Sequence, residues 1–369
     1  MKVLGLIDSF KGSLSSIQIG KILEKELKAK NIELDYFPVS DGGEGFLDAL
    51  INIKSLEKIY AYSVDPLNRK IRPYFLYDKS TDTAYIELAK TAGLNLLKKN
   101  EYNPFKTTTF GCGLLIKNAI AKNIKNIVIG IGGSCTNDGG SGILAALGVK
   151  FYDQDDKQID YLCNDSLKYI RRIDANEFFE NVKGVNIKIV SDVQNELLGE
   201  NGASFVYAPQ KGAKFDDLPL LDANMANYSN LVEKLIGARF SNLPASGAAG
   251  GVGFAFLSMF SAALIKGIDY ILNLIEFDKI KNNYDFILTG EGKIDKQSLA
   301  GKVVFEIVKR SYPVKTIVVC AINELEMSIL KNLGVYNVYS IVDSIATEEK
   351  SLSNPRMYFR KLVKNIEFK

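Results

Sequence analysis

Acidic side chains follow three apolar runs of this sequence at points where β-strands are expected to end. Asp8 comes directly after VLGLI, while Asp41 and Asp192 each come one serine after an apolar run. The carboxyl ends of parallel strands form the edge where open α/β folds bind ligands, so we expect these carboxylates to share a site. With Lys11 and Glu44 close by in the sequence, the set is typical of a site for a small, polar, phosphorylated substrate.

A glycine-rich loop, GIGGSCTNDGG at Gly130–Gly140, lies between an expected strand and an expected helix. Its backbone amides and the helix N-terminus could hold an anionic group, to which Ser134, Thr136 and Asn137 would add side-chain donors. Asp138 could cap the helix or bind a metal. The alternative is a tight strand-to-helix turn with an N-cap and no ligand. The loop is not a Walker A motif, because no GK[ST] follows at the required spacing.

The segment TGEGKIDKQSLAGK, Thr289–Lys302, combines a strand end, a glycine turn and charges of both signs. The carboxylates of Glu291 and Asp295 are oxygen ligands of the kind that Mg²⁺ takes, and lysines such as Lys302 could neutralise phosphate charge. A shorter segment, PQKGA, offers Lys211 on a turn and is a weak signal by itself.

Histidine is absent from the 369 residues, which excludes Ser-His, Cys-His and His-zinc chemistry. Proton transfer must therefore fall to Asp, Glu, Lys, Tyr or water. Many carboxylates, several lysines and glycine loops favour phosphoryl transfer, which depends on positioning, metal ions and charge stabilisation. Redox and acyl-transfer chemistry fit this inventory poorly.

Composition and charge indicate which kinds of partner the protein can bind and in which cellular compartment it works. The formal net charge is +3 and the basic residues are spread along the chain, so no nucleic-acid footprint is expected. Four widely spaced cysteines without metal-ligand spacing favour a reducing cytoplasm. Asp8 interrupts the first apolar run before it could act as a targeting signal. Residues 247–265 carry no charge, but their glycines favour a buried loop and core helix over a membrane span.

Alternating strand and helix patterns occur at both ends of the chain, and β-rich stretches with turn signals between residues 56 and 88 predict hairpins. We predict an α/β protein with two domains. Residues 1–55 and 284–369 form a flavodoxin-like, Rossmann-like domain with a parallel sheet built from both termini. Residues 56–283 form an inserted second α/β domain, and the active site is expected in the cleft between the two.

Seven segments, in order and spread across nearly the whole chain, closely resemble the glycerate kinase type 1 family. They are DSFKGS, SDGGEG, IGGSCTNDGG, DVQNELLGENGAS, PQKGA, GAAGGVGF and TGEGKIDKQSLAGK. The resemblance implies an ATP-dependent kinase that uses Mg²⁺ and converts D-glycerate to 2-phosphoglycerate. Two positions depart from many relatives, Glu196 in place of proline and Ala300 in place of histidine. They bear on loop geometry and remove none of the roles below.

The resemblance carries functional residues onto matching positions, and we interpret their roles in four groups. Asp192 is expected to activate the hydroxyl, with Lys11 and Asp41 as further catalytic residues. The residues expected to bind substrate are Asp8, Ser9, Glu44, Asn195 and Lys211. The residues expected to bind nucleotide phosphates are Gly132, Gly133, Ser134, Thr136, Asn137 and Lys302. The residues expected near Mg²⁺ are Asp41, Glu291 and Asp295.

Two other readings of the sequence stay open. The protein could be a kinase of a related small hydroxy acid, because motifs do not reveal pocket size. It could also be a non-catalytic sensor of glycerate or nucleotide, although a binding module has no need of a base. The expected partners are glycerate and ATP, with no nucleic acid and no membrane, and a homodimer is an option that the sequence does not decide.

Overall fold

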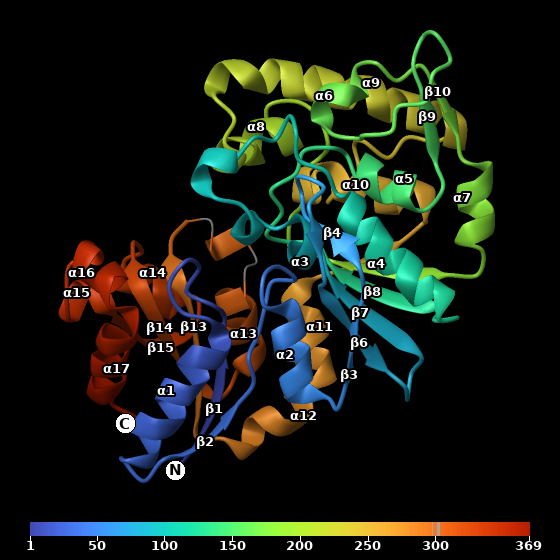
Figure 1. The fold of residues 1–369 in the computed structure, drawn as a ribbon. Coiled ribbons are helices and arrows are strands. Elements are labelled where there is room, and N and C mark those ends of the chain that lie inside the picture. Colours follow the sequence, from blue (N-terminus) through green and yellow to red (C-terminus); the bar gives the residue numbers. More distant parts are fainter. Residues whose placement is uncertain (297, 301–302) are drawn as a thin grey trace. The chain divides into compact units, whose positions relative to one another are not determined.

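The computed structural model describes residues 1–296, 298–300 and 303–369. The chain divides into two compact units, each described here by itself (Figure 1). Unit 1 comprises Met1–Asp41, Asp48–Ser55 and Lys266–Lys369, and unit 2 comprises Gly42–Leu47 and Leu56–Ile265. These units differ from the predicted domain ranges at two places, because residues 42–47 belong to unit 2 and residues 266–283 belong to unit 1.

Unit 1 is built on a five-stranded sheet in which every pair of neighbours is parallel. The order along the sheet is β15 (Val335–Ser340), β14 (Lys315–Asn323), β13 (Phe286–Ile294), β1 (Lys2–Ile7) and β2 (Glu33–Tyr36). Counted in chain order within this sheet, the strands run 2-1-3-4-5, which is the flavodoxin-like order. The predicted α/β class, with a parallel sheet drawn from both termini, is confirmed.

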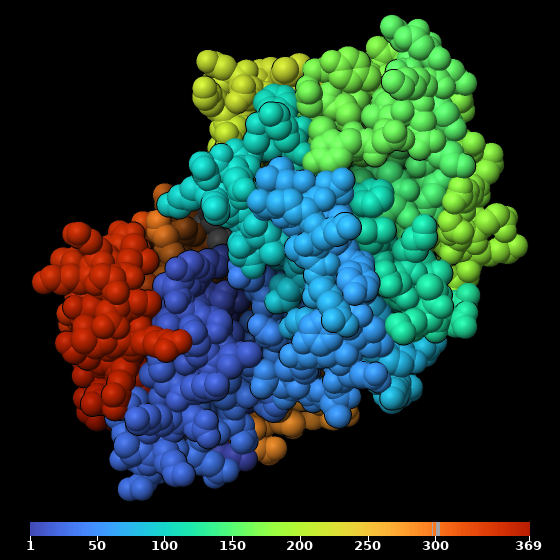
Figure 2. Space-filling model, in the orientation of Figure 1, coloured from blue at the N-terminus to red at the C-terminus, as the bar shows by residue number. Residues whose placement is uncertain are grey.

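Successive residues of a strand point to opposite faces of the sheet. Both faces of this sheet are apolar, and helices cover each of them. Ile317 and Val319 of β14 pack in one core with α1 (Ser16–Lys28) and α17 (Pro355–Asn365). Val318, between them, packs in another core with α13 (Val303–Ser311) and α14 (Met327–Asn332). In the space-filling view, the red C-terminal helices adjoin the dark blue surface of the N-terminal segment (Figure 2).

Local sequence signals explain where α1 begins and which face it buries. Ser15 caps the helix through a capping box with Gln18. The helix buries one apolar face against the sheet, with a large aliphatic side chain at every fourth residue, namely Ile19, Leu23 and Leu27. The remaining helices of unit 1 are α11 (Gly267–Leu274), α12 (Phe277–Ile280), α15 (Ile341–Ser344) and α16 (Glu348–Ser353), while α2 (Phe46–Ile53) starts in unit 2 and continues in unit 1.

Unit 2 contains a six-stranded mixed sheet. Its order is β12 (Ala263–Ile265), β11 (Asn186–Val190), β8 (Asn126–Gly130), β7 (Thr83–Glu87), β6 (Tyr74–Asp78) and β3 (Glu57–Tyr60). The first four strands are parallel, and β7, β6 and β3 pair antiparallel. The hairpins predicted between residues 56 and 88 are therefore present. Two small antiparallel pairs complete the strands, β4 (Ser63–Val64) with β5 (Lys70–Ile71) and β9 (Lys150–Tyr152) with β10 (Arg172–Asp174).

The helices of unit 2 pack around one large apolar core. They are α3 (Ala89–Ala92), α4 (Phe110–Ala121), α5 (Ser141–Ala146), α6 (Asn164–Leu167), α7 (Asn176–Asn181), α8 (Ala203–Tyr207), α9 (Leu218–Ile236) and α10 (Ala248–Met259). The uncharged stretch 247–265 forms α10, a buried helix as predicted, and also strand β12, which the sequence did not predict. Within the described residues, every helix is too short or too polar to cross a membrane.

Candidate active site

In unit 1, Asp8 lies at the carboxyl end of the parallel sheet. Its backbone NH donates to the carbonyl oxygen of Gly290 over 3.0 Å, which continues the β1 to β13 pairing by one residue. The side chain is only 5% exposed, and its Oδ1 accepts a hydrogen bond of 2.6 Å from the NH of Ser9. Sheet pairing thus fixes a buried carboxylate at the edge that the sequence predicted.

Lys11 and Asp41 join the first two acidic motifs. The Nζ of Lys11 lies 2.9 Å from Oδ2 of Asp41, with the two side chains 73% and 30% exposed. The negative charge of Asp41 is the largest contribution to the raised pKa of Lys11. The ammonium therefore keeps its charge at neutral pH. Burial raises the pKa of Asp8 well above its ordinary value, and the negative charges of Asp41 and Glu291 add to this, while Lys11 opposes it.

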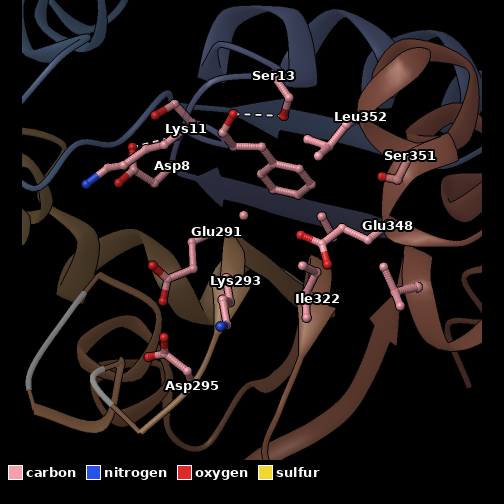
Figure 3. Close-up of a pocket in the computed structure, with 15 residues that line it drawn as sticks. Asp8, Lys11, Ser13, Glu291, Lys293, Asp295, Ile322, Glu348, Ser351 and Leu352 are labelled. Atoms are coloured by element: carbon pink, nitrogen blue, oxygen red, sulfur yellow. Dashed lines mark hydrogen bonds between the residues drawn. The ribbon is translucent and has the colours of Figure 1, made fainter. Parts of the chain in front are cut away.

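A cavity of about 290 Å³ opens beside these residues within unit 1. Figure 3 shows Asp8 and Lys11 on one side of it, Glu291 and Asp295 below them, and Glu348 of α16 on the opposite side. Five of the predicted site residues line this cavity, namely Asp8, Ser9, Lys11, Glu291 and Asp295. The carboxyl ends of β1 and β13 therefore do bring two distant acidic motifs together.

Asp295 is held by the turn that follows β13. Its Oδ1 accepts a hydrogen bond of 3.0 Å from the NH of Ser298, and the Ser298 hydroxyl lies 3.2 Å from the NH of Asp295. The carboxylate thereby shapes the turn as well as facing the cavity. Lys302, which is expected to bind the nucleotide phosphates, lies outside the described residues.

In unit 2, the loop that follows β8 contains the predicted donors Ser134, Thr136 and Asn137, all of them buried. The Nζ of Lys211 lies 2.9 Å from the hydroxyl of Ser134 and 2.7 Å from the carbonyl oxygen of Thr136. Lys211 is 2% exposed, and burial lowers its pKa to about 8. PQKGA and the glycine-rich loop therefore form one structural group.

Asp138 has a structural role in this loop. Its carboxylate accepts hydrogen bonds from the NH and hydroxyl of Thr109, at 2.8 and 2.7 Å, and from the NH groups of Gly140 and Gly142. Four donors satisfy a fully buried carboxylate, which stabilises the start of α4 and α5. Of the two roles considered from the sequence, helix capping is the one that these contacts support.

Gly132 and Gly133, expected at nucleotide phosphates, lie next to the SDGGEG segment within unit 2. The NH of Gly132 donates to the carbonyl oxygen of Gly42 over 3.0 Å, and a Cβ on Gly132 would lie 2.6 Å from the Cα of Gly43. Backbone meets backbone here, which requires glycine at position 132. Glu44 extends from this segment, is exposed, and accepts a hydrogen bond of 3.4 Å from Asn95.

Asp192 follows β11, the strand beside β8, and is half-buried. Asn195 is fixed three residues later, because its Oδ1 accepts a hydrogen bond of 2.6 Å from the hydroxyl of Tyr207 and its Nδ2 donates to Asn201. Asn195 therefore orders the DVQNELLGENGAS loop. The roles of both residues in catalysis or binding stay predictions.

Glu87 is a buried carboxylate that the motif search missed. It ends β7, is fully buried, accepts a hydrogen bond of 3.1 Å from the NH of Leu47, and lies 3.7 Å from the Nζ of Lys90. The signal that could have found it is the one used for Asp8, an acidic residue at the end of an apolar strand. Lys293 and Glu348, which line the unit 1 cavity, were also missed.

Carboxylates and lysines at the carboxyl ends of parallel strands, with glycine-rich loops beside them, place the chain among α/β phosphotransferases. The protein belongs to the glycerate kinase family, whose model matches residues 3–368.

Relatives match over almost their whole length. The glycerate kinase of Bacillus subtilis (strain 168) is 34% identical over 99% of this chain and 97% of its own. The glycerate 2-kinase of Escherichia coli (strain K12) is 33% identical over 95% and 93%. A crystal structure from Salmonella typhimurium LT2, assigned as a glycerate kinase 2, superposes with a TM-score of 0.79 at 30% identity, covering 99% and 96%.

Proposed function

We propose that the protein is a glycerate kinase that transfers the γ-phosphoryl group of ATP to D-glycerate, giving ADP and 2-phosphoglycerate. The observation that carries this proposal is the family match over residues 3–368. The charged cluster of unit 1 supports it, because phosphoryl transfer depends on fixed positive charge and positioned carboxylates more than on covalent chemistry.

In this proposal, Asp192 accepts the proton of the attacking hydroxyl, and Lys11 and Asp41 act in catalysis. Lys11 stays protonated beside Asp41 and stabilises charge on the transferring phosphoryl group. Glycerate is bound by Asp8, Ser9, Glu44, Asn195 and Lys211. The nucleotide phosphates are bound by the loop that contains Gly132, Gly133, Ser134, Thr136 and Asn137, with Lys302.

The donor chemistry fits Mg²⁺, which neutralises phosphate charge when it is bound with the nucleotide. Asp41, Glu291 and Asp295 are the carboxylates that would hold it. Within the described residues, no three such side chains are close enough to hold an ion by themselves. Mg²⁺ ordinarily takes one or two carboxylates together with substrate phosphates, so we propose that it binds with ATP.

We also propose that the enzyme works in the cytoplasm, because its four cysteines are free and buried, as suits a reducing compartment. We propose that the two compact units are domains.

The oligomeric state is a separate question. Light scattering of the purified protein measures whether it forms a homodimer.

The test is an assay that couples ADP release to NADH oxidation, run with ATP, Mg²⁺ and a panel of small hydroxy acids. We expect D-glycerate to be preferred, and phosphorus NMR of the product to show a 2-phosphate. Preference for another acid would support the related kinase. Binding of glycerate or ATP without ADP release from any acid would support the sensor and contradict the proposal.

A further inference from the structure

Three buried asparagines form a chain of hydrogen bonds that ends in the glycine-rich loop. Asn224 of α9 donates to Oδ1 of Asn164 over 3.0 Å. Asn164 of α6 donates to Oδ1 of Asn137 over 2.9 Å. The hydroxyl of Ser204 on α8 lies 3.2 Å from the same Oδ1 of Asn137. Figure 1 shows α6 and α8 beside α9, which they contact. Two of these helices contact Asn137 directly, and α9 reaches it through Asn164.

Backbone carbonyls fix the direction of this chain. The Nδ2 of Asn164 also lies 3.0 Å from the carbonyl oxygens of Asn137 and Leu221. A flipped amide would place Oδ1 of Asn164 against these two carbonyl oxygens, so Nδ2 must point at them. Since Asn164 donates, Asn137 must offer it Oδ1. The NH₂ group of Asn137 is then turned away from Asn164 and Ser204.

Two side-chain groups of the loop remain without a hydrogen-bond partner within the described part of the chain, Nδ2 of Asn137 and Oγ1 of Thr136. Both atoms are buried, and a buried polar group without a partner is costly. The Nζ of Lys211 lies 2.7 Å from the carbonyl oxygen of Thr136, so a buried cation contacts the backbone of the same loop. An amide donor and a hydroxyl without partners on two neighbouring residues suit an anionic oxygen.

We infer that Asn164 is a positioning residue that orients the amide of Asn137 so that its Nδ2 donates to a phosphate oxygen of the nucleotide. This inference rests on the proposed function, because it takes ATP as the ligand of the loop. Asn164 itself touches no ligand in this account. Its effect passes through Asn137, and no motif in the sequence marked it.

A double-mutant cycle tests the inference, with the Kd for ATP measured by calorimetry and the KM for ATP measured in the coupled assay. Asn137→Ala should raise both by roughly tenfold, the effect of losing a hydrogen bond to a charged group. Asn164→Ala should raise both several-fold and leave the KM for glycerate unchanged. In the Asn137→Ala background, Asn164→Ala should add nothing, because its target is gone. Asn164→Asp should turn the Asn137 amide around and weaken ATP binding further.

Asn227→Ala is the matched control. Asn227 is another amide of α9, and it donates to the carbonyl oxygens of Leu167 and Ile170 at 2.7 and 3.2 Å without touching the loop. It should lower the melting temperature as Asn164→Ala does, with no change in ATP affinity. Additive effects of Asn137→Ala and Asn164→Ala, or an Asn137→Ala variant with normal ATP affinity, would overturn the inference. If the ATP Kd values of the single and double variants changed as expected but the wild-type protein had no turnover, the proposed function would be overturned and this inference would stand.

Discussion

The ammonium of Lys11 lies 2.9 Å from the carboxylate of Asp41, thirty residues later in the chain. The pair joins the loop after β1 to the loop after β2, so the two acidic motifs form one electrostatic unit rather than two separate turns. Asp8, buried nearby, responds to both charges: Asp41 raises its pKa and Lys11 lowers it. A change at one of the three should therefore be measurable at the others.

Asp41→Asn should lower the pKa of Asp8, because it removes a neighbouring negative charge that favours the protonated form. It should also lower the pKa of Lys11, whose largest stabilising partner is lost. Carboxyl-detected ¹³C NMR titration of Asp8 measures the first effect. The control is Glu348→Gln, which changes a carboxylate that lines the same cavity and is not among the main causes of the Asp8 pKa shift. An equal shift in both variants would contradict the coupling.

Asp192→Asn should lower kcat by about 10² or more while leaving ATP binding nearly unchanged, the range for loss of a positioned general base. The amide keeps the shape of the side chain, so a loss of turnover without a loss of melting temperature would report on chemistry. Glu196→Gln, an exposed carboxylate four residues later in the same loop, should leave kcat unchanged. Near-normal turnover of Asp192→Asn would refute the assignment.

Much of the fold could be predicted because its signals are local. Strand and helix alternation at the two termini, together with turn chemistry between residues 56 and 88, was enough to predict the α/β class and the hairpins. The unit boundary could not be predicted at residues 42–47, because their membership of unit 2 depends on backbone contacts with Val190 and Gly132. Gly42 approaches the backbone of Gly132 and Val190 closely, and contacts between residues so far apart in the chain leave no local signal in the sequence.

The candidate site shows the same limit. Motifs marked Asp8, Lys11 and Glu291 because each follows an apolar run, although β13 extends beyond the expected strand end and includes Glu291. They did not mark Asn164, whose importance comes from contacts 27 and 60 residues away in the chain. PQKGA was only a weak signal by itself, because the burial of the Lys211 ammonium against Ser134 and Thr136 comes from tertiary packing.

Burial of Lys211 predicts a specific pH dependence of stability. Its pKa is about 8 in the folded protein against an ordinary 10.5, so between these values the unfolded chain binds more protons at this amine. Stability must therefore rise with pH across that window. Relative to Lys211→Met, the free energy of unfolding of the wild type should rise by about 1.4 kcal/mol per pH unit above pH 8.

Urea denaturation at several pH values measures this difference, with Lys214→Met, which changes an exposed lysine three residues away, as the control. The wild type and Lys211→Met should converge in pH dependence below pH 8, where the amine is protonated in both states. Parallel curves for the two proteins between pH 8 and 10.5 would contradict the burial-induced shift.

Gly42 and Gly45 provide a matched pair that separates backbone strain from steric clash. Both have left-handed φ values, 86° and 89°, so alanine at either should cost about 1–2 kcal/mol for conformation alone. A Cβ on Gly45 would meet nothing within 4 Å, whereas one on Gly42 would lie 2.5 Å from the carbonyl oxygen of Val190. Gly42→Ala must therefore also displace the end of β11, two residues before Asp192.

We expect Gly45→Ala to lower only the free energy of unfolding, measured by urea denaturation. Gly42→Ala should lower it by more and should also reduce kcat in the coupled assay, because the displaced strand end carries the proposed base. If the two variants lost equal stability, the close approach of Gly42 to Val190 would be wrong. If Gly42→Ala lost stability but kept a normal kcat, the end of β11 would tolerate displacement, and Asp192 would be a poor choice for a group that must be held in place.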